Sequence, residues 1–251
     1  MSRFGHAEIG TLTPPPLSLA LIGFGDQGWG PRFVSGVILT LEISFAGYGV
    51  GIVLGLLGVW AKLAKARPAR WIGEIYTTLV RAVPELLLII LLYYTGTQAL
   101  EGLMRDIGLS ESFSVNPFVA AVVTLGFVQG AYLTEVFRGA ILSVPVGVSE
   151  AARALALRPL QRTWLVTLPI ALRYALPGMS NMWLAILKDS SLISVVGFSE
   201  LLFTGKTAAS ATKHYFFFLA FTALLFLVLT GVSSIVLGLI RRSTERGMVR
   251  A

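Results

Sequence analysis

The chain has 251 residues, of which 55% are apolar and only 13% are Asp, Glu, Lys or Arg. Soluble domains carry about 25% charged residues, and a mean hydropathy of +0.78 leaves too few polar side chains to cover a surface that faces water. The composition therefore excludes a soluble enzyme and a disordered segment, and it predicts a membrane protein. Because the sequence contains no cysteine, disulfide bonds, cysteine metal sites and thiol catalysis are excluded as well.

Five segments are apolar over the roughly 20 residues that a helix needs to cross the hydrocarbon core. They predict an all-α polytopic protein with five transmembrane helices. The first segment is interrupted by Glu42 and the fourth carries Lys188 and Asp189, whereas the last has no charge. The spans are expected at about residues 33–60, 72–100, 117–137, 174–198 and 215–240.

The distribution of Lys and Arg predicts the orientation of these spans. The segments that follow spans one, three and five hold most of the Lys and Arg residues, whereas the intervening segments hold fewer. Because basic loops stay in the cytoplasm, we expect an outer N-terminus, with residues 1–29 as an extracytoplasmic segment, and a cytoplasmic C-terminus. The net charge of +7 is then an orientation signal, and no nucleic-acid partner is expected.

The cytoplasmic segment after the third span is too long and too regular for a simple turn. Pro145 and Gly147 break the chain, and Ser149 is expected to cap a helix that starts near Glu150. The sequence EAARALAL strongly favours a helix.

A second short helix is expected directly after the first. Arg158-Pro159 should end or bend the first helix, because the residue before proline is pushed out of the helical region. A second helical stretch, Leu160 to Thr167, then leads into the fourth span. The pattern predicts a compact two-helix knob over about residues 146–168; an amphipathic segment lying on the lipid surface is the alternative.

The knob sequence resembles the EAA loop of ABC importer membrane subunits, in which Glu-Ala-Ala is followed by glycine and then by Ile-x-Leu-Pro. Glu150 to Ala152 and Leu168-Pro169 match this pattern. Ala156 stands where the family usually has glycine, and Val166 stands where it has isoleucine. If the backbone at Ala156 has a positive φ, alanine carries a steric cost there that glycine avoids.

The resemblance extends over residues 30–251, which we interpret as one ABC importer transmembrane domain. SGVILTLEIS, IYTTLVRAVPELLLIILLYY, GAYLTEVFRGAILSVP and LRYALPGMSNMWLAILKDSSLISVVGFSELL occur in the order seen in the polar amino acid subfamily. The most similar group is the Q-type subunit of the histidine/lysine/arginine/ornithine and octopine/nopaline importers.

This resemblance implies a type I importer permease of the bacterial inner membrane that performs no catalysis and binds no cofactor. It implies two copies of a cytoplasmic ATPase that use ATP and Mg, a periplasmic binding protein, and a second permease subunit, either M-type or another copy of this chain. The substrate would be a polar, basic amino acid or an opine. The chain lacks the G-x-x-x-x-G-K-[ST] loop of an ATPase, which agrees with this division of labour.

In the knob, charged residues would contact the ATPase and small or apolar residues would pack. The expected ATPase-coupling residues are Glu150, Ala151, Ala152, Arg153, Leu155, Ala156, Leu168 and Pro169.

Ionisable groups within the spans are the candidates for the substrate pathway, because each costs about 2.5–3.5 kcal/mol at the bilayer centre. Glu135 and Asp189 could serve as counter-charges for a cationic substrate. The alternatives are an ion pair of Glu135 with Arg138, and local pairing of Asp189 with Lys188 or Ser191. The candidate pathway residues are Glu135, Asp189, Ser190, Ser191 and Asn181.

The other intramembrane carboxylates have structural interpretations. Glu85, after Pro84, is expected to mark a helix break near the inner face, and Glu42 could face a dimer partner. A self-contained secondary transporter would instead use Glu42, Glu135 and Asp189 as an ion relay, but five spans without a visible repeat argue against it. A membrane scaffold would leave the knob unexplained.

Three further patterns receive structural interpretations. Gly47, Gly51 and Gly55 form a small-residue face on which helices can approach closely. The string Gly23, Gly25, Gly28 matches G-x-G-x-x-G, but it lacks a strand–helix context and is interpreted as a turn. His6 and His214 are isolated and predict no metal site.

Overall fold

The computed structural model describes residues 19–25, 28–106, 108 and 114–244, and all regular secondary structure within them is helical. Most of the expected N-terminal segment, with His6, lies outside these residues. The helices are α1 (Gly30–Leu63), α2 (Arg67–Ala82), α3 (Glu85–Asp106), α4 (Pro117–Leu142), α5 (Val146–Ala154), α6 (Pro159–Arg162), α7 (Leu168–Asp189), α8 (Leu201–Thr212) and α9 (Tyr215–Thr244).

Four helices of the described chain are long and apolar enough to cross a membrane, namely α1, α3, α4 and α9 as far as Arg242. Helices α1, α4 and α9 coincide with three expected spans, and α3 matches only the later part of the second. Together they confirm a multi-pass membrane protein. Helix α7 is less apolar, because Arg173, Lys188 and Asp189 lie within its 22 residues. The count of five spans and their orientation stay predictions.

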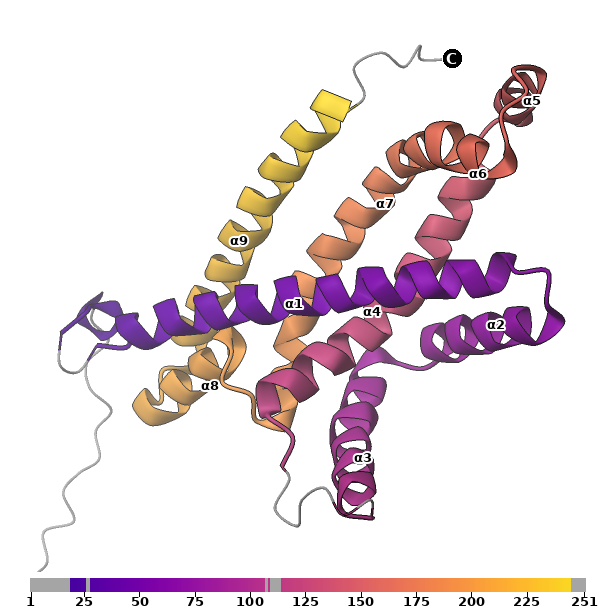
Figure 1. The fold of residues 1–251 in the computed structure, drawn as a ribbon. Helices are drawn as coiled ribbons and strands as arrows, with labels where there is room; N and C mark the ends of the chain where they lie inside the picture. Colours follow the sequence, from indigo (N-terminus) through magenta and orange to yellow (C-terminus); the bar gives the residue numbers. More distant parts are fainter. Residues whose placement is uncertain (1–18, 26–27, 107, 109–113, 245–251) are drawn as a thin grey trace, which may run out of the picture.

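The α1–α4 pair forms the centre of the fold (Figure 1). Three glycines of α1 face α4. A Cβ added at Gly47 or Gly51 would lie 3.3 Å from α4 side-chain atoms, and one at Gly55 would lie 2.8 Å from Leu133 Cβ. The absence of side chains at these positions lets the two backbones approach closely. Buried Leu125 and Leu133 of α4 fill the interface.

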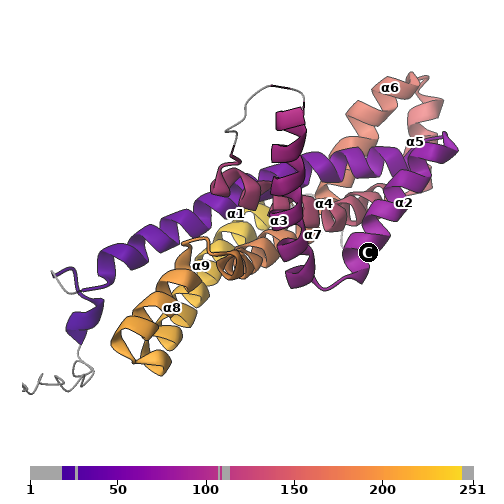
Figure 2. The ribbon, with the colours of Figure 1, turned by 90° about the horizontal axis from the view of Figure 1, so that it is seen from below.

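The second expected span is not one helix, and this corrects the prediction of a continuous segment over 72–100. Helix α2 ends at Ala82, and Val83 has the extended backbone (φ −99°, ψ 142°) that a following proline imposes. Helix α3 begins at Glu85 and runs in a different direction, whereas α2 lies alongside α1 (Figures 1 and 2). The break at Pro84 was expected; the change of direction was not.

The fourth expected span also differs from its prediction over 174–198. Helix α7 begins at Leu168, ends at Asp189, and is followed by a 3-10 helix over Ser190–Val196. The chain reverses at Gly197, whose φ of +87° is accessible to glycine at little cost.

Helix α8 lies in the segment that was expected to be a simple outer loop before α9. The buried Glu200 carboxylate caps this helix by accepting hydrogen bonds from the backbone N–H groups of Leu202 (2.7 Å) and Phe203 (2.9 Å). The N–H of Leu201 donates to the Thr40 hydroxyl, which ties α8 to α1.

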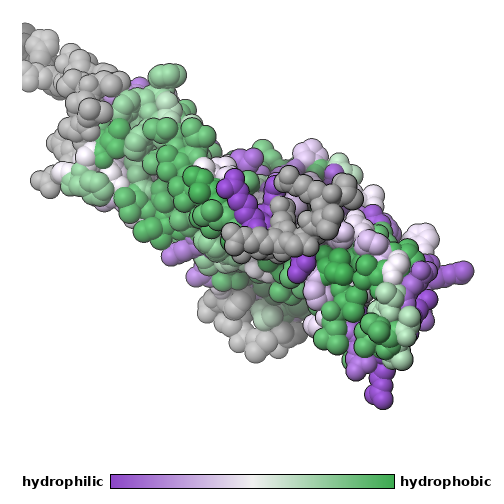
Figure 3. All heavy atoms as spheres, turned by 90° about the horizontal axis from the view of Figure 1, so that it is seen from above, coloured by the Kyte–Doolittle hydropathy of each residue, from purple (hydrophilic) through white to green (hydrophobic). Residues whose placement is uncertain are grey.

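On the face that Figure 3 shows, hydrophobic side chains gather toward one end of the molecule, and hydrophilic side chains lie around its middle and at the other end. Hydrophobic side chains cover most of the visible face near the start of α1, and hydrophilic side chains project from the opposite end. Within the apolar window of α9 no residue is buried by the rest of the described chain. Such exposed apolar area fits contact with lipid or with another membrane subunit.

Candidate coupling site and substrate pathway

The predicted two-helix knob is present beyond the end of α4. Helix α5 starts at Val146 after an extended Pro145, so the expectation that Ser149 caps a helix starting near Glu150 was wrong. The N–H of Val148 already bonds the Pro145 carbonyl (3.1 Å), which begins the helix one turn earlier. Arg158 is extended before Pro159, as expected, and α6 continues through a π-helical turn at Thr163–Thr167 into α7.

The corner between α5 and α6 is a Schellman motif centred on Ala156. The N–H of Leu157 bonds the Ala152 carbonyl (3.2 Å), and the N–H of Ala156 bonds the Arg153 carbonyl (2.9 Å). Ala156 has a φ of +55°. The position where the EAA loop usually has glycine is therefore a left-handed backbone position, which alanine occupies with strain.

The knob presents a mixed charged and apolar surface. Glu150 and Arg153 are exposed, whereas Ala152 is buried against the knob itself. Leu155 and Leu160 are 75% and 71% exposed. Trp164, four residues after Leu160, is exposed as well. Leu168-Pro169 forms the first turn of α7, so the knob is continuous with α7 as well as connected to α4.

The structure places Glu135 in an ion-pair network. One carboxylate oxygen accepts from Arg138 (2.9 Å), which confirms the local pair offered as an alternative. The other oxygen accepts from Lys62 at the end of α1. Sequence reasoning missed Lys62, because a lysine in a basic loop carries no signal of burial.

Asp189 lies apart from Glu135, in a polar cluster where α3, α4 and α7 meet. Its Oδ2 accepts from the Gln129 side-chain amide (2.9 Å). Gln129 is 2% exposed, and its Oε1 has no hydrogen-bond partner within the described residues. The Glu85 carboxylate acts on Asp189 as a nearby like charge. Gln129 was missed, although a lone amide in an apolar span could have indicated it.

The other candidate pathway residues use their polar groups locally. The Ser190 hydroxyl donates to the Leu187 carbonyl (2.9 Å), and the Ser191 hydroxyl donates to the Lys188 carbonyl (2.6 Å) instead of to Asp189. Asn181 is exposed two turns earlier on α7. These three residues are therefore not brought together with Asp189 in one ligand cluster.

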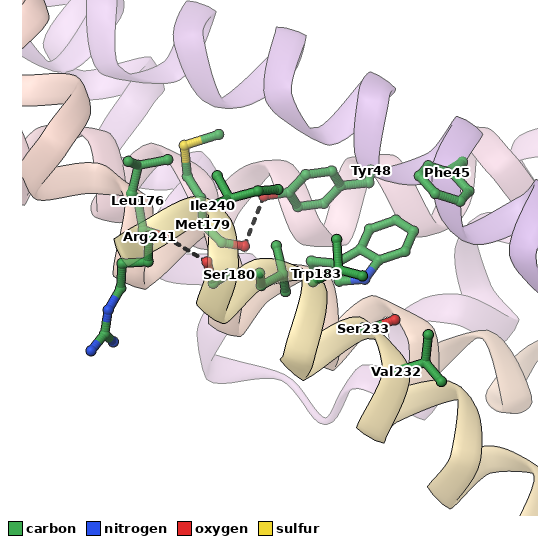
Figure 4. A pocket seen from close by; sticks show the side chains of 12 residues that line it. Phe45, Tyr48, Leu176, Met179, Ser180, Trp183, Val232, Ser233, Ile240 and Arg241 are labelled. Atoms are coloured by element: carbon green, nitrogen blue, oxygen red, sulfur yellow. Dashed lines mark hydrogen bonds between the residues drawn. The ribbon is translucent and has the colours of Figure 1, made fainter. Parts of the chain in front are cut away.

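A groove lies between α1, α7 and α9 (Figure 4). It has a volume of about 430 Å³ and is lined mainly by apolar side chains, including Phe45, Tyr48 and Trp183. The Tyr48 hydroxyl donates to the Met179 carbonyl (2.8 Å) across it. None of the candidate pathway residues lines this groove, which makes it unsuited to a polar amino acid.

The glycine string before α1 has the structural role that was expected. Gly23, Gly25 and Gly28 form a turn before α1, closed by the Gly28 N–H to Gly25 carbonyl bond (2.8 Å). Within the part of the chain that the structure describes, no group of three metal-binding side chains comes together.

A multi-pass helical protein with a protruding two-helix knob and a polar cluster inside the bundle has the architecture of a membrane transport subunit. A profile of the family described as binding-protein-dependent transport system inner membrane component matches residues 51–246. The chain belongs to this family, and it is a permease subunit of an ABC importer.

Curated relatives support the same family. The nopaline transport system permease protein NocQ of Agrobacterium fabrum (strain C58) is 40% identical over 87% of this chain and 93% of its own length. The histidine/lysine/arginine/ornithine transport system permease protein HisQ of Salmonella typhimurium (strain LT2) is 38% identical over 89% and 98%.

Solved structures show the same fold. One, described as a crystal structure of an amino acid ABC transporter with histidines, has a TM-score of 0.74 at 28% identity and covers 86% of this chain and 95% of its own. The MetNI methionine ABC transporter in an inward-facing conformation has a TM-score of 0.70 at 22% identity, covering 91% and 99%. The type I importer permease fold is thereby confirmed.

Proposed function

We propose that this chain carries a basic amino acid or an opine across the bacterial inner membrane, with its N-terminus outside. The polar cluster of Asp189, Gln129 and Glu85 supports the substrate class. Two carboxylates and an unpartnered amide oxygen lie together among apolar helices, and such a set of acceptors suits a cationic group. The names of the nopaline and HisQ relatives point to the same class of substrate.

Of the two candidate counter-charges, we propose that Asp189 and not Glu135 binds the cationic substrate. Both carboxylate oxygens of Glu135 accept from basic side chains, so this residue has little capacity for a cationic ligand. Asp189 keeps Oδ1 for a ligand after Oδ2 accepts from Gln129. We keep Ser190, Ser191 and Asn181 as pathway-lining residues.

Uptake into vesicles containing the assembled importer tests the substrate proposal, with arginine and glutamine as probes. Asp189→Asn should lower arginine uptake about ten- to hundredfold, because a hydrogen bond to a charged group contributes about 1.5–3 kcal/mol. Glutamine uptake should change little. Lys188→Gln, at the exposed neighbouring position, is the matched control. If Asp189→Asn lowered arginine uptake and glutamine uptake equally, Asp189 would not recognise the charge of the substrate.

The partners are proposed to be two copies of a cytoplasmic ATPase, a second permease subunit and a periplasmic binding protein. The second permease is an M-type subunit or another copy of this chain, and exposed Glu42 on α1 would face it. Affinity purification of the chain from its native membrane tests this assembly. Recovery of the chain alone, still transporting without ATP, would overturn the proposal in favour of a secondary carrier.

The knob is proposed to dock on the ATPase through its exposed charged and apolar residues, which supports the coupling role of residues 146–169. Glu150→Lys should leave assembly of the permease intact and lower transport per ATP hydrolysed. The matched control is Asp106→Lys, the same charge change at an exposed position at the end of α3. Unchanged coupling in Glu150→Lys, measured as uptake against phosphate release, would contradict the docking role.

A further inference from the structure

Lys62 is the least expected buried residue of the structure. It lies in the last turn of α1, where a lysine would ordinarily extend its ammonium group into water. Its side chain is instead only 4% exposed. A buried ammonium group is retained only where all of its hydrogen atoms find acceptors.

The ammonium group of Lys62 has three partners on two other helices. On α2 it donates to the Thr77 hydroxyl (2.9 Å) and pairs with the Glu74 carboxylate (2.9 Å). On α4 it donates to Glu135. Since an ammonium group has three donors, these contacts use all of them, and they can form together only while α1, α2 and α4 keep one arrangement.

Glu135 extends the network toward the knob. Its second oxygen is held by Arg138 (2.9 Å), so two basic and two acidic side chains balance each other. Helix α4 continues from Glu135 for two turns to Leu142 and then enters the knob through Pro145. The network therefore lies at the base of the knob.

Two glycines bring the helices around this network so close together that the helices cannot slide past one another. A Cβ at Gly73 would lie 2.7 Å from Lys62 Cγ, and a Cβ at Gly58 would lie 2.2 Å from the Thr134 hydroxyl oxygen. Separations under 3 Å require atoms to move. Helix α1 is thus in direct contact with α2 at Gly73 and with α4 at Gly58, close to the buried ammonium group.

Helix α3 is outside this packed unit. The chain leaves the helical conformation at Val83-Pro84, and α3 then runs away from α1 and α2 (Figures 1 and 2). The first residue of α3, Glu85, belongs to the polar cluster with Asp189. The Val83-Pro84 break consequently separates the Lys62 network from Glu85, whereas Gln129 of the same cluster lies on α4.

We propose that Lys62 is a positioning residue that joins α1, α2 and α4 into one body with the base of the knob. When the knob moves, α2 moves with it, and the change in angle occurs at Val83-Pro84, between α2 and α3. Displacement at the ATPase is then transmitted to the carboxylate cluster. This inference rests on the proposed docking of the knob on the ATPase.

Distances between spin labels in the assembled importer test the proposal, and the cysteine-free chain allows labels at chosen positions. The first pair is Trp71→Cys on α2 with Leu142→Cys at the end of α4, whose native side chains are 69% and 62% exposed. The second pair joins Trp71→Cys to Leu103→Cys on α3, across the break. Each pair is measured without nucleotide and after trapping with Mg-ATP and vanadate.

In the otherwise native chain, we expect the first pair to keep one distance in both states and the second pair to change. Lys62→Met should make the first distance broaden and shift between the states, and Lys62→Arg should restore the native result, because a guanidinium group can serve the same acceptors. A first distance that changes in the native chain, or stays fixed in Lys62→Met, would overturn the proposal.

A second variant covers the case in which Lys62→Met does not assemble because Glu135 keeps Arg138 but loses the buried partner of its other oxygen. The double variant Lys62→Met/Glu135→Gln removes both charges and should assemble while still losing the fixed first distance. If it keeps that distance, Lys62 has no positioning role. Failure of the assembled native importer to hydrolyse ATP and trap vanadate would instead contradict the proposed function, because every variant then lacks the ATP-driven step, whatever the role of Lys62.

Discussion

Replacement of Ala156 by glycine is expected to stabilise the corner of the knob. The left-handed φ of +55° costs an L-residue about 1–2 kcal/mol, and glycine avoids this cost. Glycine also makes the unfolded chain more flexible, and this destabilises the folded state by about 0.4–1 kcal/mol, which offsets part of the gain. The net expectation for Ala156→Gly is a local stabilisation of about 0.5–1 kcal/mol.

Hydrogen exchange of the knob measures this effect more directly than global unfolding. A change of about 0.5–1 kcal/mol should slow exchange roughly two- to fivefold for amides that exchange by local opening, such as the Leu157 N–H that bonds to Ala152. Peptides covering residues 146–162 would report it in the purified permease. Peptides from α9 should be unchanged.

Ala154→Gly is the matched control, because Ala154 is exposed two residues earlier with a helical backbone. There glycine should destabilise α5 by about 0.5–1 kcal/mol and speed exchange. The two substitutions are chemically identical and should have opposite signs. If Ala156→Gly also speeds exchange, the left-handed conformation at Ala156 is not the one populated, and the reasoning fails.

Two further predictions concern close packing and capping. Gly58→Ala should destabilise the permease by about 1–3 kcal/mol, because its Cβ would overlap Thr134; Gly49→Ala in the same helix, with open space around it, should be neutral or stabilising, as melting temperatures in detergent would show. Glu200→Ala should cost about 0.5–2 kcal/mol and speed exchange in α8 by removing its cap. Glu200→Gln should keep much of the protection of α8 against exchange, because its side-chain oxygen can still accept the capping hydrogen bonds. If both variants lost protection equally, the charge of Glu200 and not its hydrogen bonds would stabilise α8.

The sequence by itself determined the class of protein and much of its local structure. Apolar runs are dictated by the bilayer, so α1, α4 and α9 lie where hydropathy predicted them, with ends moved by a few residues. Proline acts on its immediate neighbours, so the breaks at Pro84 and Pro159 could be predicted as well. The resemblance to the EAA loop located the knob and singled out Ala156.

Tertiary structure alone decided which charges meet. Lys62 and Glu74 lie on consecutive helices and Glu135 lies 73 residues beyond Lys62, and only the approach of α1, α2 and α4 brings the three together. The pairing of Gln129 with Asp189 likewise needs α4 against α7. The physical reason is range: hydropathy and backbone preferences act within a helix turn or along one span, whereas burial and ion pairing depend on which helices pack side by side.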